Sequence, residues 1–274
     1  MRWMYNPIKY LFFGDIYGEN TISFIGAGPG DPELITVKGK RLIREADVII
    51  YAGSLVNPAV LDGHKEDAVV YNSAEMHLEE VVEVMRKAEA EGRKCVRVHT
   101  GDPAIYGAHR EQMDLLDGLG IEYEVVPGVS SAFGAAAALK KEYTLPGDKQ
   151  SQTVIFTRME GRTPVPGRES IRELAKHRAT MVIFLSTGFL DDLCRELVEG
   201  GYPRDTPAAV VYKATWPDQR IVEGDLTDIA SKVRGAGITK TALILVGNFL
   251  GDDYERSKLY DRYFTTEFRK GEPQ

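Results

Sequence analysis

The sequence predicts an α/β protein made of two α/β domains, with a ligand cleft between them. Short apolar runs of strand length alternate with amphipathic segments of helical period, a pattern typical of mainly parallel sheets covered by helices. The alternation stops in the polar stretch KEYTLPGDKQ (141–150) and then starts again. The 274 residues are enough for two modest domains, and a cleft between such domains is a common place for a ligand.

These observations divide the chain into four parts: an N-terminal extension (1–20), a first α/β domain (21–141), a second (142–251) and a charged, aromatic tail (252–274). The extension is rich in aromatic residues and has no clear helical or strand period. We expect it to be an addition from an upstream start codon or from cloning, and an arm that binds a partner is the alternative. Its apolar stretch YLFF is too short for a signal-peptide core.

In the first domain, the apolar runs predict strands over 22–26, 47–51, 69–71, 95–99 and 123–126. Helices are expected over 36–46, 78–91 and 103–119. A fourth helix, rich in small residues, follows the turn PGVSS, and Ser130 is its expected cap.

In the second domain, strands are expected over 153–157, 181–186, 208–213, 220–223 and 242–246. Helices are expected to end near 176 and to cover 189–199 and 226–233. The two halves show no sequence repeat.

The composition is that of an acidic cytoplasmic protein. A net charge of −7 argues against nucleic acid as the main partner, because binding a phosphate backbone requires a basic face. Cys95 and Cys194 lie far apart and form no C-x-x-C pair, which suits a reducing compartment. No apolar run approaches the ~18 residues that would span a bilayer, so we expect no membrane partner.

The stretch VRVHTGDPAIY (96–106) is the most informative part of the chain. It predicts a buried strand that ends in a sharp Thr-Gly-Asp turn, with Asp102 as a helix N-cap and Pro103 at the first helical position. Such a turn brings backbone N–H groups and a carboxylate to the carboxyl edge of a sheet, where open α/β folds bind small ligands. A plain strand-to-helix turn is the alternative.

The glycine-rich loop GAGPGD (26–31) does not fit a dinucleotide fingerprint. The third glycine of that fingerprint is replaced by Asp31, whose carboxylate would repel a pyrophosphate. No acidic ribose ligand follows the second strand, and no Gly-Lys-Ser/Thr completes a Walker loop. The loop is therefore expected to be either a structural turn or an edge of the substrate site.

Metal and acyl-enzyme chemistry are both disfavoured. The five histidines show no i, i+4 pair and no HExxH motif. Ser130 and Ser131 lack the G-x-S-x-G elbow of a nucleophile. At a helix N-terminus these serines offer hydroxyl and N–H donors to a ligand carboxylate, or they serve only as caps.

Three arginines, Arg158, Arg162 and Arg168, share one Pro/Gly-rich loop with Glu160 and Glu169. The planar guanidinium is the best partner for a carboxylate. The loop is therefore a candidate for binding a carboxylate-rich ligand, and a solvated loop is the alternative.

Five motifs in order resemble the tetrapyrrole methyltransferases, the class III S-adenosylmethionine-dependent enzymes of the cobalamin and sirohaem pathways. They are FIGAGPGDPELITVKG (24–39), TGDPAIYG (100–107), VVPGVSSAFGAAA (125–137), VIFLSTG (182–188) and VVYKATWPDQ (210–219). The resemblance covers residues about 21–250, nearly the whole chain. Within the family, NSAEMHLEE (72–80) and IFTRMEGRTPVP (155–166) are most similar to the branch that methylates carbon 11 of a corrin precursor, with or without cobalt.

The resemblance implies a homodimer that holds S-adenosylmethionine folded between the two domains, and a carboxylate-rich tetrapyrrole as substrate. Carried over position by position, it implies cofactor contacts at Pro29, Thr100, Gly101, Asp102, Ile105, Tyr106, Ser130, Ser131, Leu185 and Ala214. It implies no metal ligand and identifies no general base. The arginine loop is then expected to bind the substrate carboxylates, with the GAGPGD turn beside the macrocycle.

Several rival functions remain open. Within the family, the alternative is another precorrin methylase or a uroporphyrinogen-III methyltransferase. A ribosomal RNA methylase of the same fold is disfavoured by the acidic chain, and a diphthine synthase is a weaker rival. A nucleotide-dependent oxidoreductase lacks its glycine and its acidic ribose ligand. A non-catalytic ligand carrier would keep the cleft without turnover.

Overall fold

The computed structural model describes residues 21–273, which divide into two compact units. Unit 1 runs to Ala27 and resumes at Ile35–Gly128, and unit 2 consists of Gly28–Leu34 together with the chain from Val129 onward. The extension expected over 1–20 lies outside the described residues. The composition change at 141–150 falls inside unit 2, because the chain already leaves unit 1 after Gly128.

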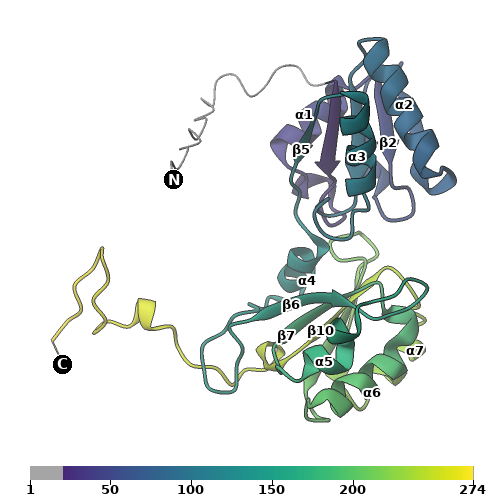
Figure 1. Ribbon diagram of the computed structural model, residues 1–274. Helices are drawn as coiled ribbons and strands as arrows, with labels where there is room; N and C mark the ends of the chain where they lie inside the picture. Colours follow the sequence, from purple (N-terminus) through teal and green to yellow (C-terminus); the bar gives the residue numbers. More distant parts are fainter. Residues whose placement is uncertain (1–20, 274) are drawn as a thin grey trace, which may run out of the picture. The chain divides into compact units, whose positions relative to one another are not determined.

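Unit 1 is built on a five-stranded parallel sheet (Figure 1). Its strands are β1 (Ile22–Gly26), β2 (Val48–Tyr51), β3 (Val69–Asn72), β4 (Cys95–His99) and β5 (Tyr123–Val126), in the order β3-β2-β4-β1-β5. Central β1 pairs with both β4 and β5. The sheet therefore brings the carboxyl ends of β1, β4 and β5 to one edge.

Helices cover both faces of this sheet, which is why its central strands are continuous apolar runs. Helices α2 (Leu78–Ala90) and α3 (Arg110–Leu119) pack on the face that carries Phe24 and Ile50. Helix α1 (Val37–Glu45) covers the other face, where Ile43 is fully buried.

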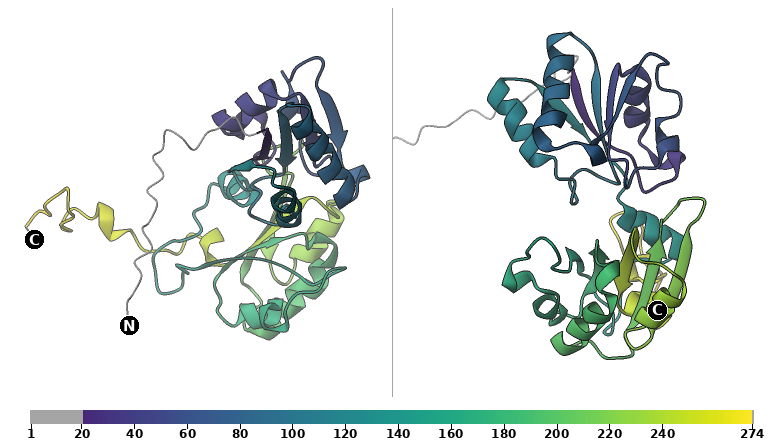
Figure 2. Two further views of the ribbon diagram at one scale, coloured as in Figure 1. Left: turned by 45° about the horizontal axis from the view of Figure 1, so that its top comes forward. Right: turned by 90° about the vertical axis from the view of Figure 1, so that its right-hand side faces the viewer.

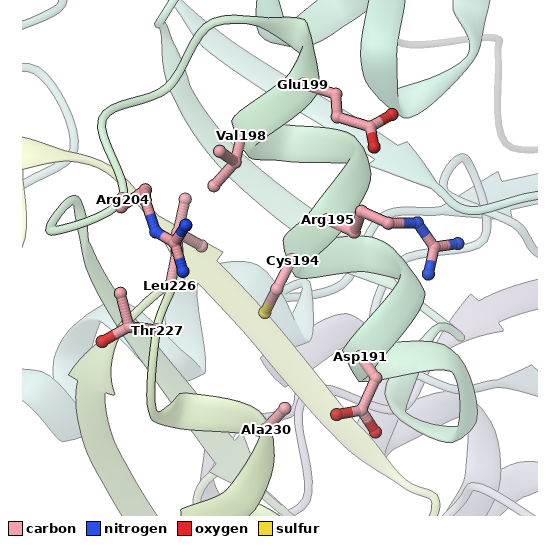
Figure 3. A pocket seen from close by; sticks show the side chains of 9 residues that line it. All are labelled: Asp191, Cys194, Arg195, Val198, Glu199, Arg204, Leu226, Thr227 and Ala230. Carbon is pink, nitrogen blue, oxygen red and sulfur yellow. The ribbon is translucent and has the colours of Figure 1, made fainter.

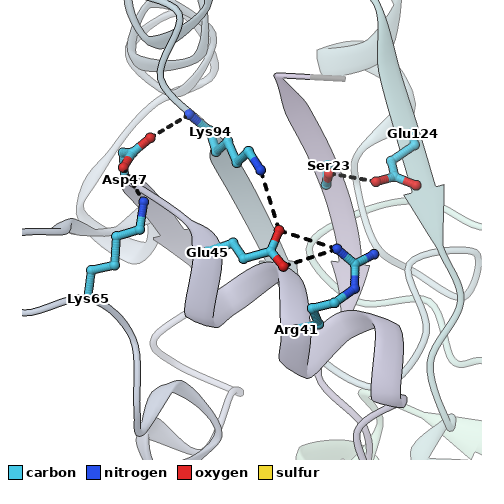
Figure 4. Close-up of polar contacts among 7 residues, drawn as sticks. All are labelled: Ser23, Arg41, Glu45, Asp47, Lys65, Lys94 and Glu124. Atoms are coloured by element: carbon cyan, nitrogen blue, oxygen red, sulfur yellow. Dashed lines mark hydrogen bonds and ion pairs between the residues drawn. The ribbon is translucent and has the colours of Figure 1, made fainter. Parts of the chain in front are cut away.

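Polar side chains cluster at the amino ends of the strands (Figure 4). Asp47, just before β2, accepts hydrogen bonds from the Lys65 ammonium at 2.6 Å and the Lys94 amide at 2.8 Å. Glu45 pairs with Arg41 and with the Lys94 side chain. Each exposed pair contributes little stability by itself. The turns that carry the sequence motifs lie at the opposite edge, at the carboxyl ends of the strands.

The mainly parallel sheet that the alternation predicts is found in unit 1, whereas unit 2 contains a second five-stranded sheet that is mixed. Its strands are β6 (Val154–Arg158), β7 (Thr180–Phe184), β8 (Pro207–Tyr212), β9 (Arg220–Asp225) and β10 (Ala242–Val246), in the order β6-β7-β10-β8-β9. Only β6 and β7 pair in parallel. The short β8–β9 connection forms a hairpin, and β10 inserts antiparallel to both of its neighbours. A parallel pairing needs a longer crossover than such a turn provides.

Three helices of unit 2, α5 (Ile171–Ala175), α6 (Leu190–Gly200) and α7 (Ile229–Gly235), pack on one face of this sheet (Figure 2). Helix α4 (Ser131–Leu139) contacts β10. The tail after Asp252 contains one short turn of 3-10 helix (Lys258–Tyr260) and exposes most of its aromatic rings.

Three turns of unit 1 meet in direct backbone contact at the carboxyl ends of β1, β4 and β5. A Cβ added at Gly26 would lie 2.5 Å from the carbonyl oxygen of Gly101 and 2.6 Å from the Cα of Gly128. The Ala27 amide also donates to the His99 carbonyl at 2.8 Å. Because these neighbours are backbone atoms, no side chain fits at Gly26, and glycine is required there by close approach.

Replacing Gly26 with alanine is therefore expected to lower the free energy of unfolding by about 2–3 kcal/mol, because the turns must separate to admit the methyl group. The matched control is Gly118→Ala in α3, where the added Cβ meets no atom within 4 Å. This control should gain up to about 1 kcal/mol of helix propensity. Denaturant unfolding of both variants measures the difference, and a Gly26→Ala protein as stable as the wild type would refute the packing argument.

Candidate functional site

Asp102 joins two of the turns at the carboxyl edge of unit 1. One carboxylate oxygen accepts the Ala104 amide at 2.8 Å, and the other accepts the Gly128 amide at 2.8 Å. The first bond closes the turn after β4, and the second ties that turn to the one after β5. Hydrogen bonds from backbone amides to a carboxylate are stronger than neutral ones. Asp102 therefore fixes the shape of this edge.

The prediction that Asp102 caps a helix beginning at Pro103 is wrong. Helix α3 begins only at Arg110, and residues 100–109 form a loop. Tyr106 and Ala108 have φ angles of 53° and 47°, in the left-handed region that interrupts a right-handed helix. The Asp-Pro pair thus starts a turn, which leaves ten residues of loop at the ligand-binding edge of a parallel sheet.

The five residues of this loop that the resemblance implies as cofactor contacts are Thr100, Gly101, Asp102, Ile105 and Tyr106. Gly101 is buried, Ile105 is half-buried and Tyr106 is exposed. The Thr100 hydroxyl donates to the Leu55 carbonyl at 3.4 Å. All five therefore lie on one loop of unit 1.

The loop 28–30, here called the GPG loop, belongs to unit 2. Two residues that follow β8 hold it there. The Trp216 indole N–H donates to the Pro29 carbonyl at 3.2 Å, and the Asp31 amide donates to the Thr215 hydroxyl at 2.9 Å. Gly30 is pressed against the indole, so that an added Cβ would lie 2.0 Å from the ring. These contacts bring Pro29 next to the turn that contains Ala214.

The start of α4 reaches the same place in unit 2. The buried Ser130 caps α4 by accepting the Ala132 amide at 3.3 Å, as the sequence predicts. Gly134, one turn further on, faces the Pro29 ring closely enough that an added Cβ would lie 2.7 Å from it. The structure thus brings together Pro29, the serines at 130–131 and Ala214.

Strained backbone marks the carboxyl edge of the second sheet. Strands β6, β7 and β8 run in the same direction, because β10 is antiparallel to both β7 and β8. Leu185, directly after β7, has a φ of 54° although its side chain is 62% exposed. Lys213 and Thr215, on either side of Ala214, have φ angles of 46° and 69°. Such strain costs stability and tends to concentrate at ligand sites.

The three arginines of the predicted substrate loop have different environments. Arg158 donates to the Thr163 carbonyl at 3.1 Å and to the Pro164 carbonyl at 2.7 Å. Its guanidinium therefore stabilises the conformation of the loop that contains it. Arg168 pairs with the neighbouring Glu169 at 3.3 Å. Arg162 is exposed and has no ion pair or hydrogen bond within residues 21–273. Of the three arginines, Arg162 is therefore the one most available to donate hydrogen bonds to a ligand carboxylate.

A hollow in unit 2 lies between α6 and the start of α7 (Figure 3). Its volume is about 440 Å³, and its lining residues are Asp191, Cys194, Arg195, Val198, Glu199, Arg204, Leu226, Thr227 and Ala230. None of them is a residue that the sequence predicts for the site. Burial raises the pKa of the Cys194 thiol to about 11, which leaves it protonated and unreactive at neutral pH.

Two further features bear on the class of protein. No group of three or more His, Cys, Asp or Glu side chains in the described part of the chain is arranged to hold a metal ion. Within the same residues, no helix has both the length and the apolar character needed to cross a membrane.

The fold and the loops at its sheet edges define a two-unit α/β protein of the methylase class. A family model described as Tetrapyrrole (Corrin/Porphyrin) Methylases matches residues 21–230. The chain belongs to this family, as the five motifs predict.

Two curated relatives are similar to this chain over about nine-tenths of its length. A cobalt-precorrin-4 C(11)-methyltransferase of Methanocaldococcus jannaschii is 58% identical over 250 residues, which cover 91% of this chain and 96% of the relative. A precorrin-4 C(11)-methyltransferase of Pseudomonas aeruginosa is 49% identical over 253 residues, covering 92% of this chain and all of the relative.

Solved structures agree with this. The X-ray structure of a cobalt precorrin-4 methyltransferase, a cobalamin biosynthetic enzyme, matches with a TM-score of 0.81 at 50% identity, over 84% of this chain and 96% of that one. A uroporphyrin-III C-methyltransferase from Thermus thermophilus, solved with S-adenosylhomocysteine, matches with a TM-score of 0.68 at 26% identity, over 84% and 92%.

Sequence reasoning missed four residues that shape these loops. Thr215 and Trp216 hold the GPG loop from a distance of more than 180 residues along the chain. Arg97 and Gln112 lie buried behind the loop that follows β4. A signal for Arg97 was present, because an arginine inside the apolar run CVRVH must be hydrogen-bonded when it is buried.

Replacing Asp102 with alanine is expected to weaken binding of S-adenosylhomocysteine about tenfold or more, because the turns after β4 and β5 lose their shared acceptor. Asp102→Asn keeps one acceptor oxygen and should lose less affinity. Titration calorimetry measures both constants. If Asp102→Ala bound S-adenosylhomocysteine with wild-type affinity, Asp102 would have no role in the cofactor site.

Proposed function

We propose that this chain transfers the methyl group of S-adenosylmethionine to carbon 11 of precorrin-4, with or without cobalt, in cobalamin biosynthesis. The observation that carries the proposal is the identity of 49–58% to two curated C11-methyltransferases, almost over their whole length. The resemblance of the segments at 72–80 and 155–166 to the same branch supports it.

The cofactor contacts are proposed at the ten positions carried over from the family. In unit 1 they are Thr100, Gly101, Asp102, Ile105 and Tyr106, and in unit 2 they are Pro29, Ser130, Ser131, Leu185 and Ala214. The character of these residues fits a ligand with an apolar adenine, polar ribose hydroxyls and a charged amino-acid end. Backbone groups at strand ends suit the hydroxyls, the half-buried Ile105 and the exposed Leu185 suit the adenine, and the start of α4 suits a carboxylate.

The chemistry is an in-line displacement. The cofactor supplies a methyl group that its sulfonium already activates, so neither a metal ion nor a covalent nucleophile is needed. The carbon–sulfur bond breaks as the new carbon–carbon bond forms, and the methylated centre later loses a proton to solvent. The residues of this chain act by holding the reactants in register. Orientation of this kind is worth about 7–11 kcal/mol in the best cases.

A polyanionic substrate is compatible with an acidic chain if local cations receive it. Arg162 is the proposed contact for a substrate carboxylate, with Arg158 and Arg168 shaping the loop that presents it. The GAGPGD turn is proposed to lie beside the macrocycle.

The setting proposed for the enzyme is a cytoplasmic homodimer that binds neither nucleic acid nor membrane. The net charge of −7 supports the first exclusion, and the absence of a spanning helix among residues 21–273 is compatible with the second. The dimer is supported by family resemblance.

Incubating the purified chain with methyl-labelled S-adenosylmethionine and precorrin-4, or its cobalt complex, tests the function. The expected result is one labelled methyl group per product, located at carbon 11 by NMR. Comparing the two substrates shows whether cobalt is required. Label located at another carbon, or incorporated only when uroporphyrinogen III is supplied, would contradict the proposal and favour another branch of the family.

Reversing the charge of Arg162 with glutamate is expected to raise KM for the tetrapyrrole about tenfold, because a favourable carboxylate contact becomes a repulsive one. The affinity for S-adenosylhomocysteine should not change. Arg204→Glu is the matched control, since Arg204 is also exposed on unit 2 but lines the hollow between α6 and α7. An unchanged KM in Arg162→Glu would refute the proposal that Arg162 binds a substrate carboxylate.

A further inference from the structure

A buried arginine without an acidic partner lies behind the loop that follows β4. Arg97 is 6% exposed on that central strand, and it forms no ion pair with any residue in 21–273. Its Nη1 donates to the carbonyls of Ile50 and Val98, each at 3.3 Å. Burial lowers the pKa of the guanidinium to about 10, which still leaves it charged at neutral pH. A buried charge held only by neutral acceptors is costly, so its position calls for a reason.

The remaining contact of Arg97 supplies the reason. Its Nε donates to the side-chain oxygen of Gln112, in the first turn of α3, at 3.3 Å. A guanidinium carries donors only, so it determines which end of the amide turns toward it. The amide nitrogen of Gln112 must then point the other way, and it donates to the Ala108 carbonyl at 3.0 Å.

Ala108 lies in the strained part of the loop. Its φ of 47° and that of Tyr106, 53°, are both left-handed, although neither residue is glycine. Gly107 between them is packed so closely that an added Cβ would lie 2.1 Å from the Pro103 carbonyl oxygen. Such a conformation persists only where neighbouring groups hold it in place.

A second buried group supports the same segment. His99 is 2% exposed, and its ring lies 5.4 Å from that of His109 and 6.0 Å from that of Phe24. Burial, with the nearby Arg97 charge, lowers the pKa of His99 to about 3, so the ring is neutral. The backbone of Gly107 lies close enough to the ring to oppose part of this lowering of the pKa. The loop therefore rests on neutral His99 and on Gln112, whose orientation Arg97 determines.

We propose that Gln112, oriented by the buried Arg97, is a positioning residue that holds Tyr106 and Ala108 in the left-handed conformation needed to present Ile105 and Tyr106 to the cofactor. The proposal rests on the proposed function, because it assumes that these two residues contact S-adenosylmethionine. Gln112 itself is buried and acts only through the Ala108 carbonyl.

The replacement Gln112→Glu separates this role from a general structural one. The new carboxylate gives Arg97 the acidic partner that it lacks, and an acid at the third position of α3 suits the helix dipole. The other carboxylate oxygen, however, faces the Ala108 carbonyl and cannot donate to it. Fold stability and loop geometry are thus expected to change independently in this variant.

The experiment measures the melting temperature and the affinity for S-adenosylhomocysteine in the full-length chain, for the wild type and three variants. Gln112→Glu is expected to melt at or above the wild-type temperature and to bind about tenfold more weakly. Gln112→Leu, which leaves Arg97 with fewer acceptors, should lose both stability and affinity. Glu111→Gln, an exposed change on the same helix turn, should leave the affinity unchanged and lower the melting temperature only slightly, through the lost helix-dipole contact.

Affinity within twofold of the wild type in a stable Gln112→Glu protein would overturn the proposal, as would a loss of affinity that appears only together with a fall in melting temperature. A wild-type chain that does not bind S-adenosylhomocysteine would instead refute the proposed function. The two failures are therefore distinguishable.

Discussion

The close approach of three turns at the carboxyl edge of unit 1 is the constraint on which the rest of the site depends. Gly26, Gly101 and Gly128 are in backbone contact there, and the Asp102 carboxylate ties the turn after β4 to the turn after β5. A parallel sheet brings these strand ends to one edge, but it does not decide what shape the turns take. Glycine permits the contact, and the carboxylate selects one geometry of it. The loop that carries the proposed cofactor contacts starts from this fixed point.

In unit 2, side-chain hydrogen bonds rather than glycine contacts hold the loops in place. Thr215 and Trp216 hold the GPG loop, and the adjacent residues after β7 and β8 adopt left-handed conformations. In both units, left-handed backbone occurs near the positions proposed to contact S-adenosylmethionine. This arrangement suits a reaction in which the donor is already activated, since the protein has only to orient it. The described residues contain no metal-binding cluster, and the thiols of Cys95 and Cys194 are held protonated because burial raises their pKa values.

Much of the fold could be predicted from local patterns. A buried strand appears in the sequence as a short apolar run, and a helix often begins at a capping residue such as serine. The strands at 22–26 and 95–99 and the Ser130 cap are observed as predicted. Strand direction could not be predicted for unit 2, since an apolar run is the same in either direction. The Asp-Pro pair predicted a helix, yet residues 100–109 form a loop in which Tyr106 and Ala108 are left-handed, a conformation that local propensity does not indicate. The cofactor positions came from resemblance, and they remain predictions.

Amide hydrogen exchange of Gly128, followed by NMR in the wild-type chain, tests the central claim most directly. The amide donates to Asp102 at 2.8 Å, so it should exchange at least about a hundredfold more slowly than an unprotected amide. Saturating S-adenosylhomocysteine should slow it further, because a bound ligand stabilises the joined turns. Exchange at the unprotected rate, unchanged when the ligand is added, would contradict the account.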